Sequence, residues 1–135
     1  MRSYPVSLEK LGEQFAKLPG IGSKTARRLA FFVLGMSDED AKAFADAIVE
    51  ARRTVHTCPV CQNLTDQDTC PICADDSRDG SILCVVADPK DVTAMEKARE
   101  FRGKYHVLHG VISPLGNVGP EDLKIRELLQ RVADE

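Results

Sequence analysis

The sequence predicts an α+β protein of three modules: an N-terminal helical module, a small cysteine-rich module, and a partial α/β unit with parallel strands. Three observations predict this. Apolar residues recur at helical spacing in the first part, four cysteines stand in two close pairs in the middle, and a continuous apolar run opens the last part. We therefore place the modules at residues 1–56, 57–74 and 81–135, with a polar linker at 75–80.

The composition is that of an ordinary globular protein. The chain has 135 residues, 43% of them hydrophobic and 29% charged, so we expect a packed core rather than disorder. No apolar run approaches the roughly 20 residues that span a bilayer, and the N-terminus carries no apolar signal region. We therefore expect a cytoplasmic protein without membrane contact. In a reducing compartment, its five cysteines favour metal binding over disulfides.

Three helices are predicted in the helical module. The first covers residues 6–18, where leucine and phenylalanine recur every three or four positions. A Pro-Gly-x-Gly turn at 19–22 ends it, and Ser23 is placed to cap the second helix. The third helix is capped by Ser37. Its apolar stripe consists of Ala41, Phe44, Ala45, Ile48 and Val49.

A parallel α/β unit is predicted after the linker. The apolar run at 82–87 lacks polar alternation, as expected of a strand buried on both faces. A helix over about 90–101, a strand over 105–109 and a last helix over about 121–133, opened by Pro120, complete the pattern. The inward side chains of the first of these helices are expected to be Val92, Met95, Ala98 and Phe101. Two parallel strands form only a marginal sheet, so we expect the first half of an α/β domain.

Four cysteines form two Cys-Pro-x-Cys pairs with eight residues between them. Two residues between cysteines let both sulfurs of a tight turn reach one ion, and two such turns complete a tetrahedron. Thiolates select zinc or iron, and four protein ligands leave no open coordination position for catalysis. We therefore predict one structural Zn²⁺ per chain, bound by Cys58, Cys61, Cys70 and Cys73.

Other interpretations of the cysteines are a redox Cys-x-x-Cys pair, a rubredoxin-type iron site, and a ligand role for His56 beside the set. Two pairs so close together are better explained as ligands of one ion. Residues 58–73 also hold too few large apolar side chains to fold without a metal ion. The fifth cysteine, Cys84, lies in the apolar run and is expected to be a small buried side chain.

A positively charged surface is predicted around the glycine turn. Residues 1–35 carry six basic and two acidic side chains, although the net charge of the chain is −3. Gly20 and Gly22 are expected to adopt backbone angles closed to other residues and to let a phosphate approach the N–H groups that open the second helix. The helix face opposite the apolar stripe carries Lys24, Arg27 and Arg28.

Cations in the first turns of a helix oppose its macrodipole, which indicates a function rather than a contribution to stability. We expect these cations to bind DNA phosphates, and therefore to bind DNA of any sequence. The alternative is a basic face that is only solvated.

The order of these motifs resembles the RecR family of bacterial recombination mediators. The resemblance rests on the Leu-Pro-Gly-Ile-Gly turn, the repeated Cys-Pro-x-Cys pair, the Ile-Leu-Cys-Val-Val strand, and the segments 105–110, 112–115 and 119–122. It implies a helix-hairpin-helix module, a four-cysteine zinc finger and a Toprim α/β domain. It also implies that the four paired cysteines bind zinc and that Lys24, Arg27 and Arg28 face DNA.

The resemblance further implies a non-catalytic clamp in recombinational repair, located in the cytoplasm at the nucleoid. Members of the family act with RecO and RecF to load RecA onto single-stranded DNA, and they assemble into rings around DNA with the hairpin lining the hole. They run longer, through the rest of the Toprim fold and a C-terminal segment that helps close the ring. We therefore expect this chain to be a truncated form without that segment.

Two other functions stay open on the sequence. A zinc-stabilised adaptor that binds only proteins would share every motif but would not touch DNA. A Toprim-type, magnesium-dependent phosphoryl transferase acting on DNA would need clustered carboxylates. Asp88 and Asp91 are the only candidates, because Ala87-Asp88 stands where Toprim enzymes have a glutamate and no later Asp-x-Asp motif follows. We therefore expect no enzyme activity and a DNA partner that is single-stranded or duplex.

Overall fold

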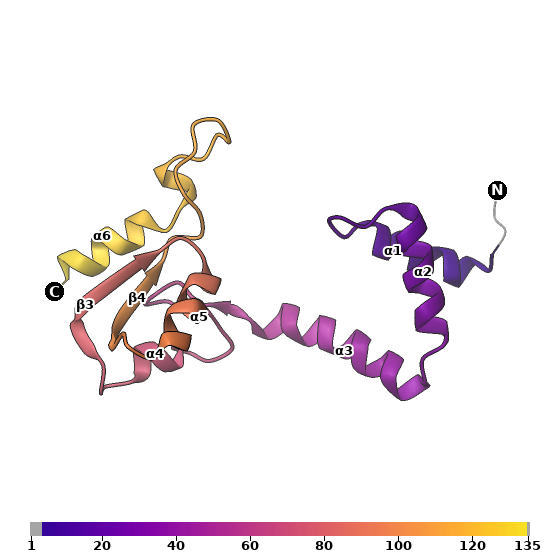
Figure 1. Cartoon of the computed structure of the whole chain (residues 1–135), viewed down its shortest axis with the longest axis horizontal. Helices are drawn as coiled ribbons and strands as arrows, with labels where there is room; N and C mark the ends of the chain where they lie inside the picture. Colours follow the sequence, from indigo (N-terminus) through magenta and orange to yellow (C-terminus); the bar gives the residue numbers. More distant parts are fainter. Residues whose placement is uncertain (1–3, 135) are drawn as a thin grey trace. The chain divides into compact units, whose positions relative to one another are not determined.

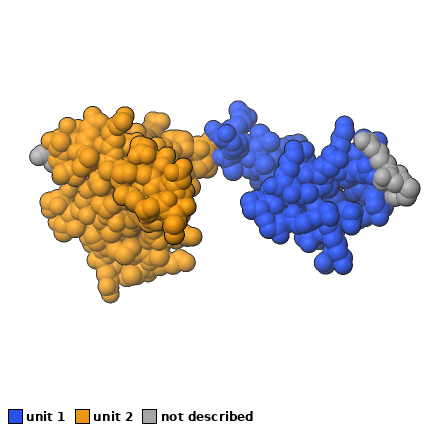
Figure 2. Space-filling view, turned by 90° about the horizontal axis from the view of Figure 1, so that it is seen from above, with its two compact units in different colours: residues 1–53 blue, residues 54–135 orange. Residues whose placement is uncertain are grey.

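The computed structural model describes residues 4–134, and Figure 1 shows its helices and strands along the chain. Residues 1–3 and 135, which fall within the first and last predicted modules, lie outside the described residues. The chain divides into two units, residues 1–53 and residues 54–135, which Figure 2 colours separately. None of the described helices combines the length and the apolar character that crossing a membrane requires.

The first unit is helical, as predicted. It contains α1 (Val6–Ala16), α2 (Ser23–Leu34) and all but the end of α3 (Asp38–Thr54). The helices α1 and α2 pack against each other, and the buried side chains of α2 are Ala26 and Ala30. Such small side chains let two helices approach closely, so this packing holds the turn between α1 and α2 in place.

One of the two predicted helix caps of this unit is wrong. Ser23 is the first residue of α2, and Gly22 occupies the cap position with an extended backbone and no side-chain hydrogen bond. A serine inside the helix cannot accept from the next N–H groups as a cap does. Ser37 caps α3 as predicted, because its Oγ accepts a hydrogen bond from the Asp40 N–H at 3.1 Å.

The apolar stripe predicted on α3 exists but is not covered. Phe44, Ile48 and Val49 are all exposed in the described structure. In the same helix, acidic side chains lie in the first turn and Arg52 and Arg53 in the last, an arrangement that the helix macrodipole favours. The helix α3 is therefore well formed locally without burying its apolar face.

The described residues of the second unit form two small sheets and four short helical segments (Figure 1). Its first part holds the antiparallel pair β1 (His56–Thr57) and β2 (Leu64–Thr65), followed by α4 (Pro71–Ala74). Its second part holds β3 (Asp79–Val86), α5 (Pro89–Ala98), β4 (Gly103–Val107), the 3₁₀ turn η1 (Pro120–Asp122) and α6 (Ile125–Ala133). The strands β3 and β4 are parallel, which confirms the predicted α+β class with a parallel strand pair.

The core of the α/β part lies around β4. Val92 of α5 packs against Tyr105 and Val107 of β4, and all three are buried. Ile72 of α4 and Phe101 pack against the same group. Ile72 also packs against the buried cysteines, so it connects the cysteine-rich module to the core of the α/β unit.

A partly buried ion pair borders this core. Arg78 donates to both carboxylate oxygens of Glu96 and, at 3.1 Å, to the carbonyl of Gly103 at the start of β4. The Tyr105 hydroxyl donates to Glu96 at 2.6 Å. The hydrogen bonds from Arg78 hold the pKa of Glu96 below its usual value. The pair thus ties the start of β3 to α5 and β4.

The burial predicted for the first strand is wrong. Ile82 is 51% exposed and Val85 is 44% exposed on β3, whereas Tyr105, His106 and Val107 of β4 are fully buried. The strand β3 pairs only with β4 among the described residues, so its outer edge has no neighbour. The continuous apolar run therefore predicted the strand correctly but did not predict how much of the strand is buried.

Three details of the helices that follow also differ from prediction. Met95 and Ala98 are exposed, and Phe101 lies beyond the end of α5, although it still packs on the core. Pro120 opens the turn η1, and α6 begins only at Ile125. The reason is Leu123, which is buried with an extended backbone and interrupts the helix.

We predict that Val92→Ala lowers the free energy of unfolding by about 2 kcal/mol, because a methyl-lined cavity replaces buried contacts in the core. The matched change Val85→Ala, on the exposed face of β3, should cost less than about 1 kcal/mol. Urea unfolding of the zinc-loaded protein followed by circular dichroism measures both. Equal losses would contradict a core centred on β4.

Candidate metal centre and nucleic-acid interface

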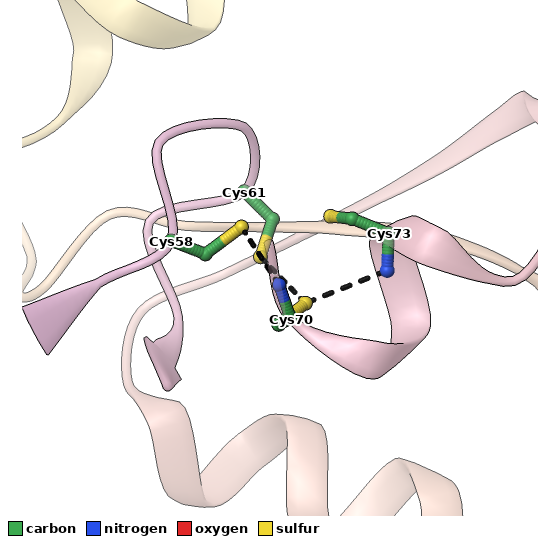
Figure 3. A group of neighbouring side chains, drawn as sticks. All are labelled: Cys58, Cys61, Cys70 and Cys73. Carbon is green, nitrogen blue, oxygen red and sulfur yellow. Dashed lines mark hydrogen bonds between the residues drawn. The ribbon is translucent and has the colours of Figure 1, made fainter. Parts of the chain in front are cut away.

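The four predicted cysteine ligands come together in the structure. Their Sγ atoms all lie within 4.8 Å of one another, and those of Cys61 and Cys70 are 3.5 Å apart (Figure 3). Four sulfurs bound tetrahedrally at about 2.3 Å from zinc are separated by about 3.8 Å. Cys58, Cys61 and Cys70 are also buried, as ligands of a structural ion are. The cluster fits one structural zinc ion.

The first two cysteines stand on a tight turn, here called the first knuckle (residues 58–63). The Gln62 N–H donates to the Cys58 carbonyl at 2.8 Å, and Gln62 adopts a left-handed backbone with φ of 66°. The chain then turns back, so that the Asn63 N–H donates to the Cys61 sulfur at 3.4 Å. Such a hydrogen bond stabilises a thiolate and orients it toward the ion.

The other two cysteines lie at the start and within α4, in a segment here called the second knuckle (residues 70–75). The Cys70 sulfur caps α4 by accepting from the Cys73 N–H at 3.4 Å, and Pro71 occupies the first position of the helix. The Cys70 N–H in turn donates to the Cys58 sulfur at 3.5 Å, which joins the two knuckles. Both contacts appear in Figure 3.

The electrostatics of the cluster favour a bound cation. A hydrogen bond from the Cys73 thiol lowers the pKa of Cys61 to about 5. The same hydrogen bond, together with burial and the neighbouring thiolates, raises the pKa of Cys73. Four thiolates within 4.8 Å of one another would repel strongly in this largely buried space. A Zn²⁺ ion supplies the charge that lets all four ionise.

Neither His56 nor Cys84 joins this cluster. His56 is exposed, and its Nδ1–H donates to the carbonyl of Thr54 at 3.1 Å. Cys84 lies on β3, where it is half-buried against the core rather than fully buried as expected. The ligand set is thus the two close pairs.

The glycine turn between α1 and α2 has an open surface. Gly20 has φ of +79°, a left-handed conformation that favours glycine, whereas Gly22 has φ of −83°, which other residues adopt. The backbone angle predicted for Gly22 is therefore wrong. A Cβ atom at either position would meet no atom within 4 Å, so a ligand can approach the backbone of both.

The cations that follow this turn are all exposed. They are Lys24, Arg27 and Arg28, and none of them forms an ion pair or side-chain hydrogen bond with another residue of the described chain. The first N–H groups of α2 have no side-chain cap either. We call this set, with Gly20 and Gly22, the hairpin surface. It offers N–H donors and unpaired positive charge in one place.

Three family models match the chain. They are the RecR helix-hairpin-helix over residues 8–52, the RecR four-cysteine zinc finger over residues 55–75, and the Toprim domain over residues 81–133. The chain belongs to the RecR family. These RecR modules place it in recombinational DNA repair with DNA binding, and the Toprim match identifies the fold of the parallel α/β part.

The RecR chain uses its two candidate catalytic carboxylates to hold a helix. Asp88 accepts from the Lys90 N–H at 2.9 Å, and Asp91 accepts from the Asp88 N–H at 3.0 Å. This reciprocal capping box, with Pro89 at the first helical position, starts α5. The sequence Asp-Pro-x-Asp before an apolar helical segment was the signal for this role, and it was missed.

The structure adds one residue that sequence reasoning did not find. The Nζ of Lys104, on β4, donates to the carbonyls of Ile72, Cys73 and Asp75 at 2.9, 3.2 and 2.8 Å. These acceptors are at the C-terminal end of α4, where a positive charge is favourable. No local pattern could predict contacts with residues 29 to 32 positions away.

We predict that Cys58→Ser reduces the zinc content from one ion per chain to none and unfolds the two knuckles. Structural zinc contributes on the order of 10–16 kcal/mol to small finger peptides, more than the few apolar contacts here can replace. Elemental analysis and limited proteolysis measure the two effects. Cys84→Ser should keep one zinc per chain. A zinc-free Cys58→Ser protein with unchanged protease resistance at residues 58–75 would refute the structural role.

Proposed function

We propose that this chain is a non-catalytic clamp subunit that binds DNA through its hairpin surface during recombinational repair. The observation that carries the proposal is the uncapped start of α2 beside three exposed, unpaired cations. In this proposal the backbone at Gly20 and Gly22 admits a phosphate, and the N–H groups of α2 bind it. Lys24, Arg27 and Arg28 bind neighbouring phosphates.

Contacts of this kind carry no base information, so the proposed binding is independent of sequence. The same contacts can be made to single-stranded or duplex DNA. The zinc module does not take part, because residues 58–80 carry one basic and five acidic side chains. Four thiolates around one Zn²⁺ add two further negative charges, which would repel a phosphate backbone.

Few phosphate contacts per chain give weak binding, so a clamp needs several copies on one DNA. We propose that the chain self-associates into a ring, and the exposed apolar stripe of α3 supports contacts between copies. This clamp, at the nucleoid in the bacterial cytoplasm, would act with RecO and RecF to load RecA onto single-stranded DNA. Co-sedimentation with purified RecO and with RecF tests this partnership, and the absence of both complexes would contradict it.

The remaining functions have less support. Asp88 and Asp91 are occupied as helix caps, which argues against their use as ligands of a catalytic magnesium ion. A protein-only adaptor would leave the cations of the hairpin surface without a role. The DNA-binding experiment below distinguishes this adaptor from the clamp.

The double variant Lys24→Ala/Arg27→Ala should weaken DNA binding and reduce the slope of log affinity against log salt by about 1.8 on duplex DNA, because two phosphate contacts are lost. Fluorescence anisotropy across a salt series measures both quantities. The matched control Lys42→Ala/Lys90→Ala removes two exposed cations outside the hairpin surface and should change neither. Unchanged DNA binding by the Lys24→Ala/Arg27→Ala variant would contradict the role of the hairpin surface and favour the protein-only adaptor.

Analytical ultracentrifugation of the chain with and without DNA should show more than one copy on each saturated DNA. Ile48→Ser should reduce the number of copies, because it removes an apolar contact of the α3 stripe without altering the cations. The zinc content of this variant serves as the folding control. A single copy per DNA at saturation would contradict the clamp.

A further inference from the structure

The first knuckle lies along one edge of β4. Neighbouring N–H groups of a strand point to opposite edges. The Leu108 N–H, just after β4, donates to the Val86 carbonyl of β3 at 2.9 Å, whereas the Val107 N–H donates to the Cys61 carbonyl at 2.8 Å. His109 adds a hydrogen bond from its Nε2 to the carbonyl of Gln62, at 2.5 Å. The backbone of the first knuckle therefore stands where a neighbouring strand would pair with β4.

The second knuckle is attached to the same strand by a side chain. The ammonium group of Lys104 has three N–H donors, and the carbonyls of Ile72, Cys73 and Asp75 use all of them. These carbonyls close the C-terminal end of α4, which has only four residues and little stability of its own. Lys104 thus fixes α4 against the sheet.

Two arginines cover further polar groups of β4. Arg78 donates to the Gly103 carbonyl at 3.1 Å, and Arg131 of α6 donates to the Tyr105 carbonyl at 2.5 Å. The first knuckle binds the Val107 N–H. Gly103, Tyr105 and Val107, the alternate residues of β4, therefore each form a hydrogen bond with a group outside the sheet. An uncovered strand edge would be open to pairing with other chains.

We propose that the zinc-bound knuckles act as the missing neighbour of β4, so that the metal ion and the parallel sheet form one cooperative unit in which Lys104 is the positioning residue. The ion joins two knuckles that hold β4 at separate points. Without the ion the two knuckles would contact β4 independently of each other. Neither would then hold its backbone carbonyls in position to accept the hydrogen bonds from β4. Two parallel strands form a marginal sheet by themselves, so the sheet depends on this support. The inference does not depend on the proposed DNA binding.

Hydrogen exchange at two adjacent amides tests the cooperative unit in the wild-type chain. The Val107 amide reports the bond to the knuckle, and the Leu108 amide reports the bond to β3. Removal of zinc with a chelator, followed by NMR, should abolish the protection of both amides together, and restored zinc should return both. Protection that persists at Leu108 while it is lost at Val107 would show that the knuckle only rests on the sheet. Protection that persists at both would also overturn the proposal.

The variant Lys104→Met tests the positioning role, because it keeps the aliphatic chain and removes the three donors. We expect zinc affinity to fall by about tenfold, as for other outer-shell partners of a metal site, in competition with a chelating indicator. The bands of tetrahedral Co²⁺–thiolate coordination should broaden or shift in the cobalt-substituted variant. Lys90→Met, a change of an exposed lysine in the same unit, should leave both readouts unchanged. Wild-type affinity and spectrum in Lys104→Met would refute the role of Lys104.

Discussion

The second unit depends on one electrostatic constraint, which is that four thiols crowded into a buried space cannot all ionise without a cation. The sulfur atoms lie within 4.8 Å of one another, and the hydrogen bond from Cys73 lowers the pKa of Cys61 while it raises that of Cys73. A divalent ion resolves this conflict and joins two turns that share little apolar surface. The knuckles then present their backbone to β4, where the core also gathers around Tyr105 and Val107.

Backbone N–H groups are important hydrogen-bond donors at the candidate sites of both units. In the knuckles they donate to sulfur, as the Asn63 and Cys73 N–H groups do. At the start of α2 they are left without a side-chain cap, beside exposed cations. The same chemical group thus donates to cysteine sulfurs in one unit and is left without a side-chain acceptor in the other. The charges agree with this division, because the positive excess lies in residues 1–35 and the negative excess in residues 58–80.

Three carboxylates of the α/β part hold its helices and strands together. Asp88 and Asp91 start α5 as a capping box, and Glu96 is held between Arg78 and Tyr105. Each carboxylate therefore has donors that fix its position and favour its charge. Asp88, Asp91 and Glu96 are thus engaged in contacts within the second unit.

The sequence by itself determined the features that depend on short spacing: the two cysteine pairs, the cap at Ser37, the left-handed Gly20, and the parallel order of β3, α5 and β4. It failed where one residue of offset matters, as at Ser23, and where burial depends on distant neighbours, as on β3. Only the tertiary structure decided that the knuckles cover β4, that Lys104 binds α4, and that the stripe of α3 stays exposed. The spacing of residues along one segment indicates which local structure that segment prefers. Whether the segment is covered, and by what, depends on packing against segments about 30 residues or more away, which no local pattern encodes.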